Sequence, residues 1–187
     1  GQSDAGANAS GYPSFALNPE EGLGRLEFSS DSADFFSEDG TVGIGASGRL
    51  SGVVLHDILS EVIVPEDLDS AVEASFAAGS IGSEDRDSIL SMLKERVESA
   101  SRLGWFPADR SKVFTESSVI NVDGEVYRPD RVIVDGKKVI VVDYKFGKEE
   151  KKYLRQIGNY ARLYKSMGYP DVEAYLWYVE NDKVVRG

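Results

Sequence analysis

The sequence predicts an α/β or α+β protein in which helices flank one central mixed β-sheet. Apolar residues follow a helical period through much of 48–103, and they alternate with polar residues through 112–145. A second helical pattern follows at 148–167, and a β-rich segment covers 172–180. The order is therefore helices, three meandering strands, one helix and one strand, which indicates a single sheet with helices packed against it.

Three helices are expected before the sheet. Apolar spacing over 50–63 is close to that of a helix, and a second helix at 67–78 is closed by Gly79. Ser83 is a suitable N-cap for the third helix, because acidic residues fill the turn that follows it. This third helix is expected to run to about Leu103.

Turn residues divide the next part of the chain into strands. The expected strands cover 112–120, 125–134 and 139–145. Asp123-Gly124 and Asp135-Gly136 are the turns between them. A long helix over 148–167 ends at Gly168, and the segment 172–180 forms the last expected strand.

The chain divides into an arm and one domain. Residues 1–47 are rich in Gly, Ser, Ala and Asp without a clear period, so we expect an irregular N-terminal arm with a short strand near 23–30. Residues 48–187 form the domain, with a helical part at 48–110 and a sheet–helix–strand core at 111–187.

Composition excludes several classes of site. The 187 residues include no cysteine, which excludes disulfides, iron–sulfur clusters and thiolate zinc sites, and which fits a cytoplasmic protein. No apolar run approaches the roughly 20 residues of a membrane span. The net charge of −11 argues against a polyanionic partner, yet residues 137–165 carry 9 basic and 3 acidic residues, a net charge of +6. A solvated helix face would also explain this positive segment.

Two aspartates and a lysine stand close together in RPDRVIVDGKKVIVVDYKFG, residues 128–147. Asp143 and Lys145 share a face of their strand, because side chains alternate. Loops of two or four residues would align Asp130 with position 141 or with Asp143, and both registers place it on that same face. An odd-length loop or a bulge would separate them.

Two neighbouring carboxylates repel each other unless a cation joins them, and Mg²⁺ or Mn²⁺ is the expected cation. Lys145 would then orient a water molecule or stabilise charge on a transferred phosphate. The alternative is structural: Asp130 would cap a turn after Pro129, and Asp143 would form a surface ion pair with Lys145.

The spacing of these residues resembles the PD-(D/E)XK nuclease superfamily. Pro129-Asp130 followed by Asp143-Tyr144-Lys145 carries the resemblance, and the DYK form followed by Gln156 and Tyr160 is similar to the RecB-type branch. An upstream histidine after a glycine, His56, and a glutamate before the first aspartate, Glu116, also fit this branch. The match covers residues 48–180 and implies a restriction-endonuclease-like core with an N-terminal helical segment.

The resemblance implies a role for each matching residue. His56, Asp130 and Asp143 would ligate the metal ion together with the backbone carbonyl of Tyr144. Lys145 would position the attacking water, and Glu116 would join Asp130, Asp143 and Lys145 as a catalytic residue. The expected DNA contacts, or supports of the site, are Gln156, Tyr160, Lys148, Lys151, Lys152 and Arg155. The lone histidine and Tyr160 also fit ordinary packing positions.

Two features depart from the family pattern. Arg128-Pro129 stands before the first aspartate, where the family often has glycine, and no cysteine is present for the iron–sulfur cluster of AddB-like relatives. The absence of cysteine favours the RecB/AddA side of the branch. The phosphate-binding motif GxxxxGK[ST] is also absent, so an ATP-driven motor would lie outside this sequence.

The resemblance thus implies a Mg²⁺-dependent exodeoxyribonuclease domain that acts on single-stranded DNA in double-strand break repair and recombination. Its partners would be the helicase domain of the same parent chain and a second repair subunit, in the bacterial cytoplasm at the nucleoid. One rival is a catalytically silent DNA-binding or scaffolding module of the same fold. Another is a small-molecule phosphohydrolase, which would need a closed pocket where the nuclease needs an open basic groove.

Overall fold

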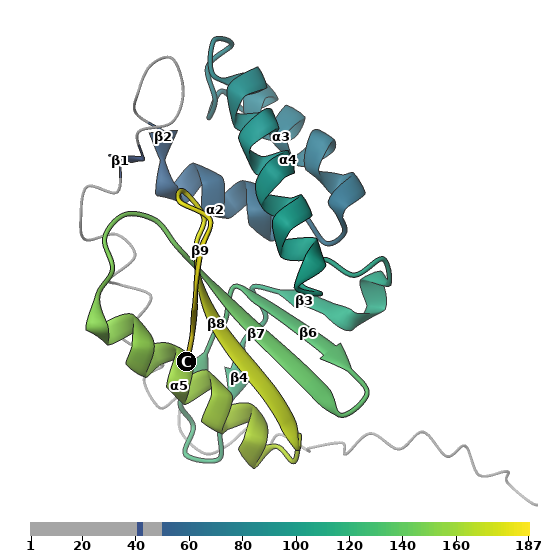
Figure 1. The fold of residues 1–187 in the computed structure, drawn as a ribbon, viewed down its shortest axis with the longest axis vertical. Coiled ribbons are helices and arrows are strands. Elements are labelled where there is room, and N and C mark those ends of the chain that lie inside the picture. Colours follow the sequence, from purple (N-terminus) through teal and green to yellow (C-terminus); the bar gives the residue numbers. More distant parts are fainter. Residues whose placement is uncertain (1–40, 43–49) are drawn as a thin grey trace, which may run out of the picture.

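The computed structural model describes residues 41–42 and 50–187 (Figure 1). Two short strands, β1 (Thr41–Val42) and β2 (Leu50–Ser51), form an antiparallel pair. Most of the expected arm at 1–47, including its short strand near 23–30, lies outside the described residues. No helix in the described ranges is both long enough and apolar enough to cross a membrane.

Five strands form one mixed sheet in the order β3-β6-β7-β8-β9. Their bounds are Val113–Thr115, Arg131–Asp135, Lys138–Lys145, Asp171–Tyr178 and Lys183–Arg186. β7 and β8 are parallel and are connected through helix α5 (Lys151–Ser166), whereas the other neighbouring pairs are antiparallel. The structure therefore confirms an α/β protein with a mixed sheet and flanking helices.

Helices cover both faces of the sheet. The helical part consists of α2 (Gly52–Glu61), α3 (Leu68–Ala77) and α4 (Arg86–Arg102), with short 3₁₀ turns η2 (Pro65–Asp67) and η3 (Arg110–Lys112). Figure 1 shows α3 and α4 on the opposite side of the sheet from α5. On β7, Ile140 and Val142 pack with the helical part, whereas Val139 and Val141 pack with α5. Alternation along the strand then turns positions 143 and 145 toward the α5 layer.

Two of the expected strands are interrupted. The segment 112–120 contains β3 and a separate β4 (Val119–Ile120), and 125–134 contains β5 (Val126–Tyr127) and β6. β4 and β5 pair with each other as a hairpin outside the five-stranded sheet. The continuous strands expected there were wrong.

Local backbone chemistry explains both interruptions. Glu116 has φ of +50°, in the left-handed region that ends a strand. Pro129 has no N–H to donate to a ladder, so pairing cannot continue through it. Glu116 and Asp130 consequently lie at the base of the hairpin, where the Glu116 N–H donates to the Asp130 carbonyl at 3.1 Å.

Two helix starts differ from the expectation, and one strand is additional. α4 begins at Arg86, after the expected cap Ser83, whose hydroxyl donates to the Glu84 carboxylate instead. α5 begins at Lys151, three residues later than expected. β9 was not expected, because its four residues are too short to show a period.

Arg131 connects the helical part to the sheet. Its side chain is fully buried, and its guanidinium lies 3.9 Å from the centre of the Phe106 ring. It donates to a hydroxyl and three backbone carbonyls, those of Tyr144, Val62, Ile63 and Trp105. Because 62 and 63 directly follow α2, these bonds hold the end of α2 against the start of β6.

We expect Arg131→Met to lower the free energy of unfolding by about 2–4 kcal/mol, because it leaves buried carbonyl groups without a donor. Urea unfolding followed by circular dichroism measures this loss. Arg102→Met is the matched control, since that exposed side chain pairs with Glu98 on the same helix, and it should change stability by less than about 0.5 kcal/mol. Equal effects of the two changes would contradict the connecting role of Arg131.

Candidate metal centre

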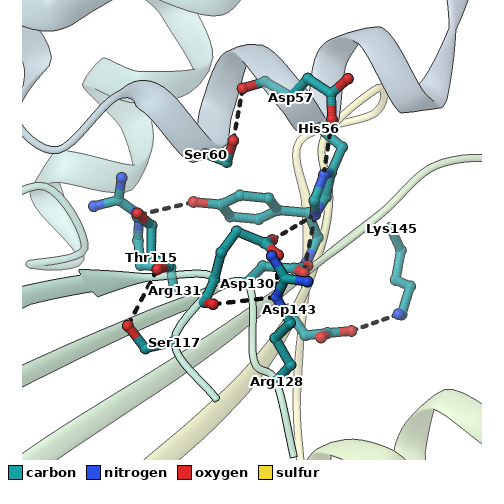
Figure 2. A network of polar contacts seen from close by, with 12 residues as sticks. His56, Asp57, Ser60, Thr115, Ser117, Arg128, Asp130, Arg131, Asp143 and Lys145 are labelled. Atoms are coloured by element: carbon teal, nitrogen blue, oxygen red, sulfur yellow. Dashed lines mark hydrogen bonds and ion pairs between the residues drawn. The ribbon is translucent and has the colours of Figure 1, made fainter. Parts of the chain in front are cut away.

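Polar side chains from three parts of the chain meet where β6 begins and β7 ends (Figure 2). Arg131 pairs with Val142, so one step outward Asp130 is level with Asp143, as in the second of the two expected registers. The Oδ2 atom of Asp130 also accepts a hydrogen bond of 2.5 Å from the Tyr144 N–H. Asp130 is thereby held against the end of β7.

Three of the expected site residues could hold a metal ion. His56 Nε2 lies 3.0 Å from Asp130 Oδ1 and 3.1 Å from Glu116 Oε1. One ligand atom from each residue lies within 4.8 Å of the others, and all three side chains are partly buried. An imidazole and two carboxylates are a donor set that suits divalent cations. Helix α2 supplies the imidazole, and the two ends of the β4–β5 hairpin supply the acids.

The two carboxylates strongly favour a protonated His56. Burial alone would lower the pKa of the imidazole, but hydrogen bonds to Asp130 and Glu116 and their negative charges raise the pKa of His56 to about 10. The proton therefore occupies the position between the acids that a cation would take. Binding of a divalent ion through Nε2 requires the loss of this proton.

Asp143 and Lys145 form a second pair beside this group. Lys145 Nζ lies 2.5 Å from Asp143 Oδ2, and the Asp143 side chain is almost fully buried. The Lys145 ammonium also lies 4.5 Å from the centre of the Tyr153 ring on α5. The expected metal set of His56, Asp130, Asp143 and Tyr144 thus differs from the group that the geometry brings together, in which Glu116 is the third member.

The charges of the two groups influence each other. Burial and the nearby Asp130 carboxylate raise the pKa of Asp143, and the Lys145 ammonium opposes this rise. Burial would lower the pKa of Lys145, but the charges of Asp143 and Asp130 raise it. The ammonium therefore stays charged, and it remains the main cation available to the buried Asp143 carboxylate.

Tyr144 contributes to the site through its N–H group and its ring. The N–H donates to Asp130, as described above, and the hydroxyl accepts from Arg131 at 2.7 Å. The ring is buried and makes an edge contact with the His56 ring, at 6.1 Å between centroids. Tyr144 therefore contacts both Arg131 and His56, and it links the buried guanidinium to the imidazole.

Gly52 allows α2 to approach the end of β7. A Cβ atom at this position would lie 2.7 Å from Cβ of Phe146, which is the residue after Lys145. Such a contact would force the first turn of α2 outward. His56 is one helical turn further on, so the glycine sets how closely the imidazole approaches Asp130.

The expected DNA-contact residues fall into two groups. Tyr160 is buried: its hydroxyl donates to the Arg128 carbonyl at 3.4 Å and accepts from Gln156 Nε2 at 3.3 Å. These two residues therefore support the segment before Asp130. Lys148, Lys151 and Arg155 are exposed, with Lys148 in the bend before α5, while Lys152 is half-buried beside Glu150 at 3.2 Å.

A scan against models of protein families finds no match for this chain, and a search of curated proteins finds none either. Two residues of this site have roles that their sequence context does not predict. Arg131 resembles any strand arginine in sequence, and Arg128 was noted only as a departure from a family pattern.

We expect the stability of the metal-free protein to fall as pH rises from 6.5 toward 10. The folded state raises the pKa of His56 above its ordinary value of 6.5, so this stabilisation is complete below that pH and is lost as the imidazole deprotonates. Urea unfolding in a chelator at a series of pH values measures it. His56→Gln, which cannot titrate, should approach the wild type at high pH, and a constant difference between pH 6.5 and 9 would contradict the prediction.

We expect Gly52→Ala to weaken the binding of Mn²⁺, because the added methyl group displaces α2 and moves His56 away from the acids. Calorimetric titration of the metal-free protein measures the affinity. Gly158→Ala on α5 is the matched control, since a Cβ there would meet no described side chain, and no backbone beyond its own helix and chain neighbours in the described ranges, within 4 Å. That variant should keep the wild-type affinity and gain about 0.5–1 kcal/mol of stability. Unchanged affinity in Gly52→Ala would argue against the positioning role.

Proposed function

We propose that this chain is a metal-dependent DNA nuclease domain of the RecB/AddA type in the PD-(D/E)XK superfamily. One observation carries the proposal: a possible metal-ligand group and a buried acid–lysine pair lie side by side at one end of the mixed sheet. A capped turn and a surface ion pair would not account for this arrangement. Asp143 is buried and Lys145 is partly buried, and the Asp130 carboxylate contacts both another strand and a helix.

In the proposed reaction, each residue of the arrangement would have a task in phosphodiester hydrolysis. His56, Glu116 and Asp130 would hold Mg²⁺ or Mn²⁺, and Asp143 would add a neighbouring carboxylate. The bound ion would supply an activated water and stabilise negative charge on the phosphate. Lys145 would hold the attacking water in line with the phosphorus. The new phosphorus–oxygen bond then forms as the bond to the leaving sugar oxygen breaks.

The charge of α5 supports nucleic acid as the substrate. This helix carries five basic residues and no acidic residue, although the whole chain has a net charge of −11. The exposed Lys151 and Arg155 stand one turn apart, and Lys148 precedes them near the end of β7. A phosphate backbone that follows these side chains would pass close to Lys145.

The biological setting follows from the same proposal. The RecB/AddA type implies an exonuclease that receives single-stranded DNA from a helicase domain of its parent chain. A second repair subunit would complete the assembly, which prepares broken ends for recombination in the bacterial cytoplasm at the nucleoid. The lack of cysteine supports the RecB/AddA side, because this chain cannot build an iron–sulfur cluster.

We expect the chain to cleave end-labelled single-stranded DNA with Mg²⁺ or Mn²⁺, and Asp143→Ala and Lys145→Ala to lower the rate by at least about 100-fold. Gel electrophoresis of the products measures the rate. The controls are Asp135→Ala, at the opposite end of β6, and Lys94→Ala, on α4, where the lysine pairs with Asp69, and both should retain wild-type rates.

Three results would separate the alternatives. DNA binding without metal-dependent cleavage by the wild type would identify a catalytically silent binding module. Cleavage that survives both substitutions would refute the assignment of Asp143 and Lys145. Hydrolysis of small phosphate esters without DNA cleavage would favour the phosphohydrolase.

A further inference from the structure

Arg128 lies next to the metal-ligand group. It directly follows β5, stands two residues before Asp130, and pairs with Glu116. Its Nε lies 2.7 Å from Glu116 Oε2 and donates to the Glu116 carbonyl at 3.1 Å. Both contacts use Nε, and the side chain is 60% exposed. The two Nη groups therefore lie outside these two contacts with Glu116, on a side chain that is largely exposed, and Figure 2 draws the arginine in the same polar network as Asp130.

The backbone of Arg128 is held in place from two sides. Its carbonyl accepts the hydrogen bond from Tyr160 on α5, which is buried and makes an edge contact with Tyr127. The next residue, Pro129, is buried and fixes the chain direction into Asp130. The backbone of Arg128 is therefore fixed. Only the torsions of its side chain need to change for the guanidinium to contact a ligand.

Glu116 is shared between two cations in this structure. One of its carboxylate oxygens faces His56 and the other faces Arg128. A divalent ion held by Glu116 would reduce the attraction of that carboxylate for both cations. The guanidinium fork would then be available, and a phosphate group is the ligand that this fork fits best, because two parallel N–H groups match two phosphate oxygens.

We propose that Arg128 is a phosphate-binding residue that Glu116 restrains until a metal ion takes up that carboxylate. The proposal rests on the nuclease function and deepens it, because it names the group that grips a substrate phosphate next to the metal. It also gives a use to the residue by which this chain departs from the glycine that the superfamily often has there.

Titration of the metal-free protein with Mn²⁺, followed by the electron paramagnetic resonance signal of the free ion, tests the competition for Glu116. Arg128→Gln should bind Mn²⁺ about three- to tenfold more tightly than wild type, because the carboxylate no longer has a competing cation. Arg102→Gln removes the same charge from a distant arginine that also pairs with a glutamate, and it should leave the affinity unchanged. Weaker Mn²⁺ binding in Arg128→Gln would overturn the proposal, since Arg128 would then serve only to hold Glu116 in place.

Fluorescence anisotropy with a labelled single-stranded oligonucleotide tests the phosphate contact. The protein carries Lys145→Ala so that the strand stays intact, and the buffer contains Mn²⁺. Adding Arg128→Gln should weaken binding about tenfold and reduce the salt slope by about 0.7, which is the loss of one phosphate contact on a single strand. Arg128→Lys should fall between the two, because it keeps the charge and loses the fork.

These results distinguish the two proposals. If the wild type cleaves DNA but Arg128→Gln leaves both the affinity and the salt slope unchanged, the phosphate-binding role is refuted and the nuclease function stands. If neither wild type nor Lys145→Ala binds the oligonucleotide, both proposals are refuted. Weaker binding together with tighter Mn²⁺ supports Arg128, and this holds even where the wild type binds DNA without cleaving it.

Discussion

The contact between the Asp130 carboxylate and the Tyr144 N–H is the constraint on which the rest of the site depends. It joins the start of β6 to the end of β7 after the regular ladder has stopped. The other carboxylate oxygen remains directed toward His56. The Asp130 side chain therefore aligns β6 with β7, and it also presents a carboxylate oxygen to His56 on α2. Without it, the metal-ligand group would have no fixed relation to Asp143 and Lys145.

The site lies where the two helical layers of the molecule meet at the end of the sheet. His56 comes from the α2 side, whereas Asp143 and Lys145 face α5. Each layer has its own means of alignment: Arg131 and Gly52 locate α2, and the contact between Lys145 and Tyr153 relates α5 to the acid–lysine pair. The chemistry at the junction depends on both layers, although neither contains the whole group.

The parts of this structure that were predictable from sequence are those with a local signal. The alternation in VIVVDYK placed Asp143 and Lys145 on one face, and the turn at Gly136 limited Asp130 to registers that kept it there. The interruptions at Glu116 and Pro129 were missed, although the polar run at 115–118 and a proline that cannot donate to a ladder mark them in the sequence. The role of Arg131 was not predictable, since it depends on carbonyl groups about 26 to 69 positions away in the chain.

The β4–β5 hairpin interrupts the sheet between two of the residues that could bind a metal ion. Glu116 precedes it and Asp130 follows it, and the bond between their backbones closes its base. A longer or different hairpin tip would leave this backbone bond intact. Related chains could therefore vary the loop while the distance between the two acids stays the same. The insertion point is thus a place where new recognition elements could be added without rebuilding the centre below.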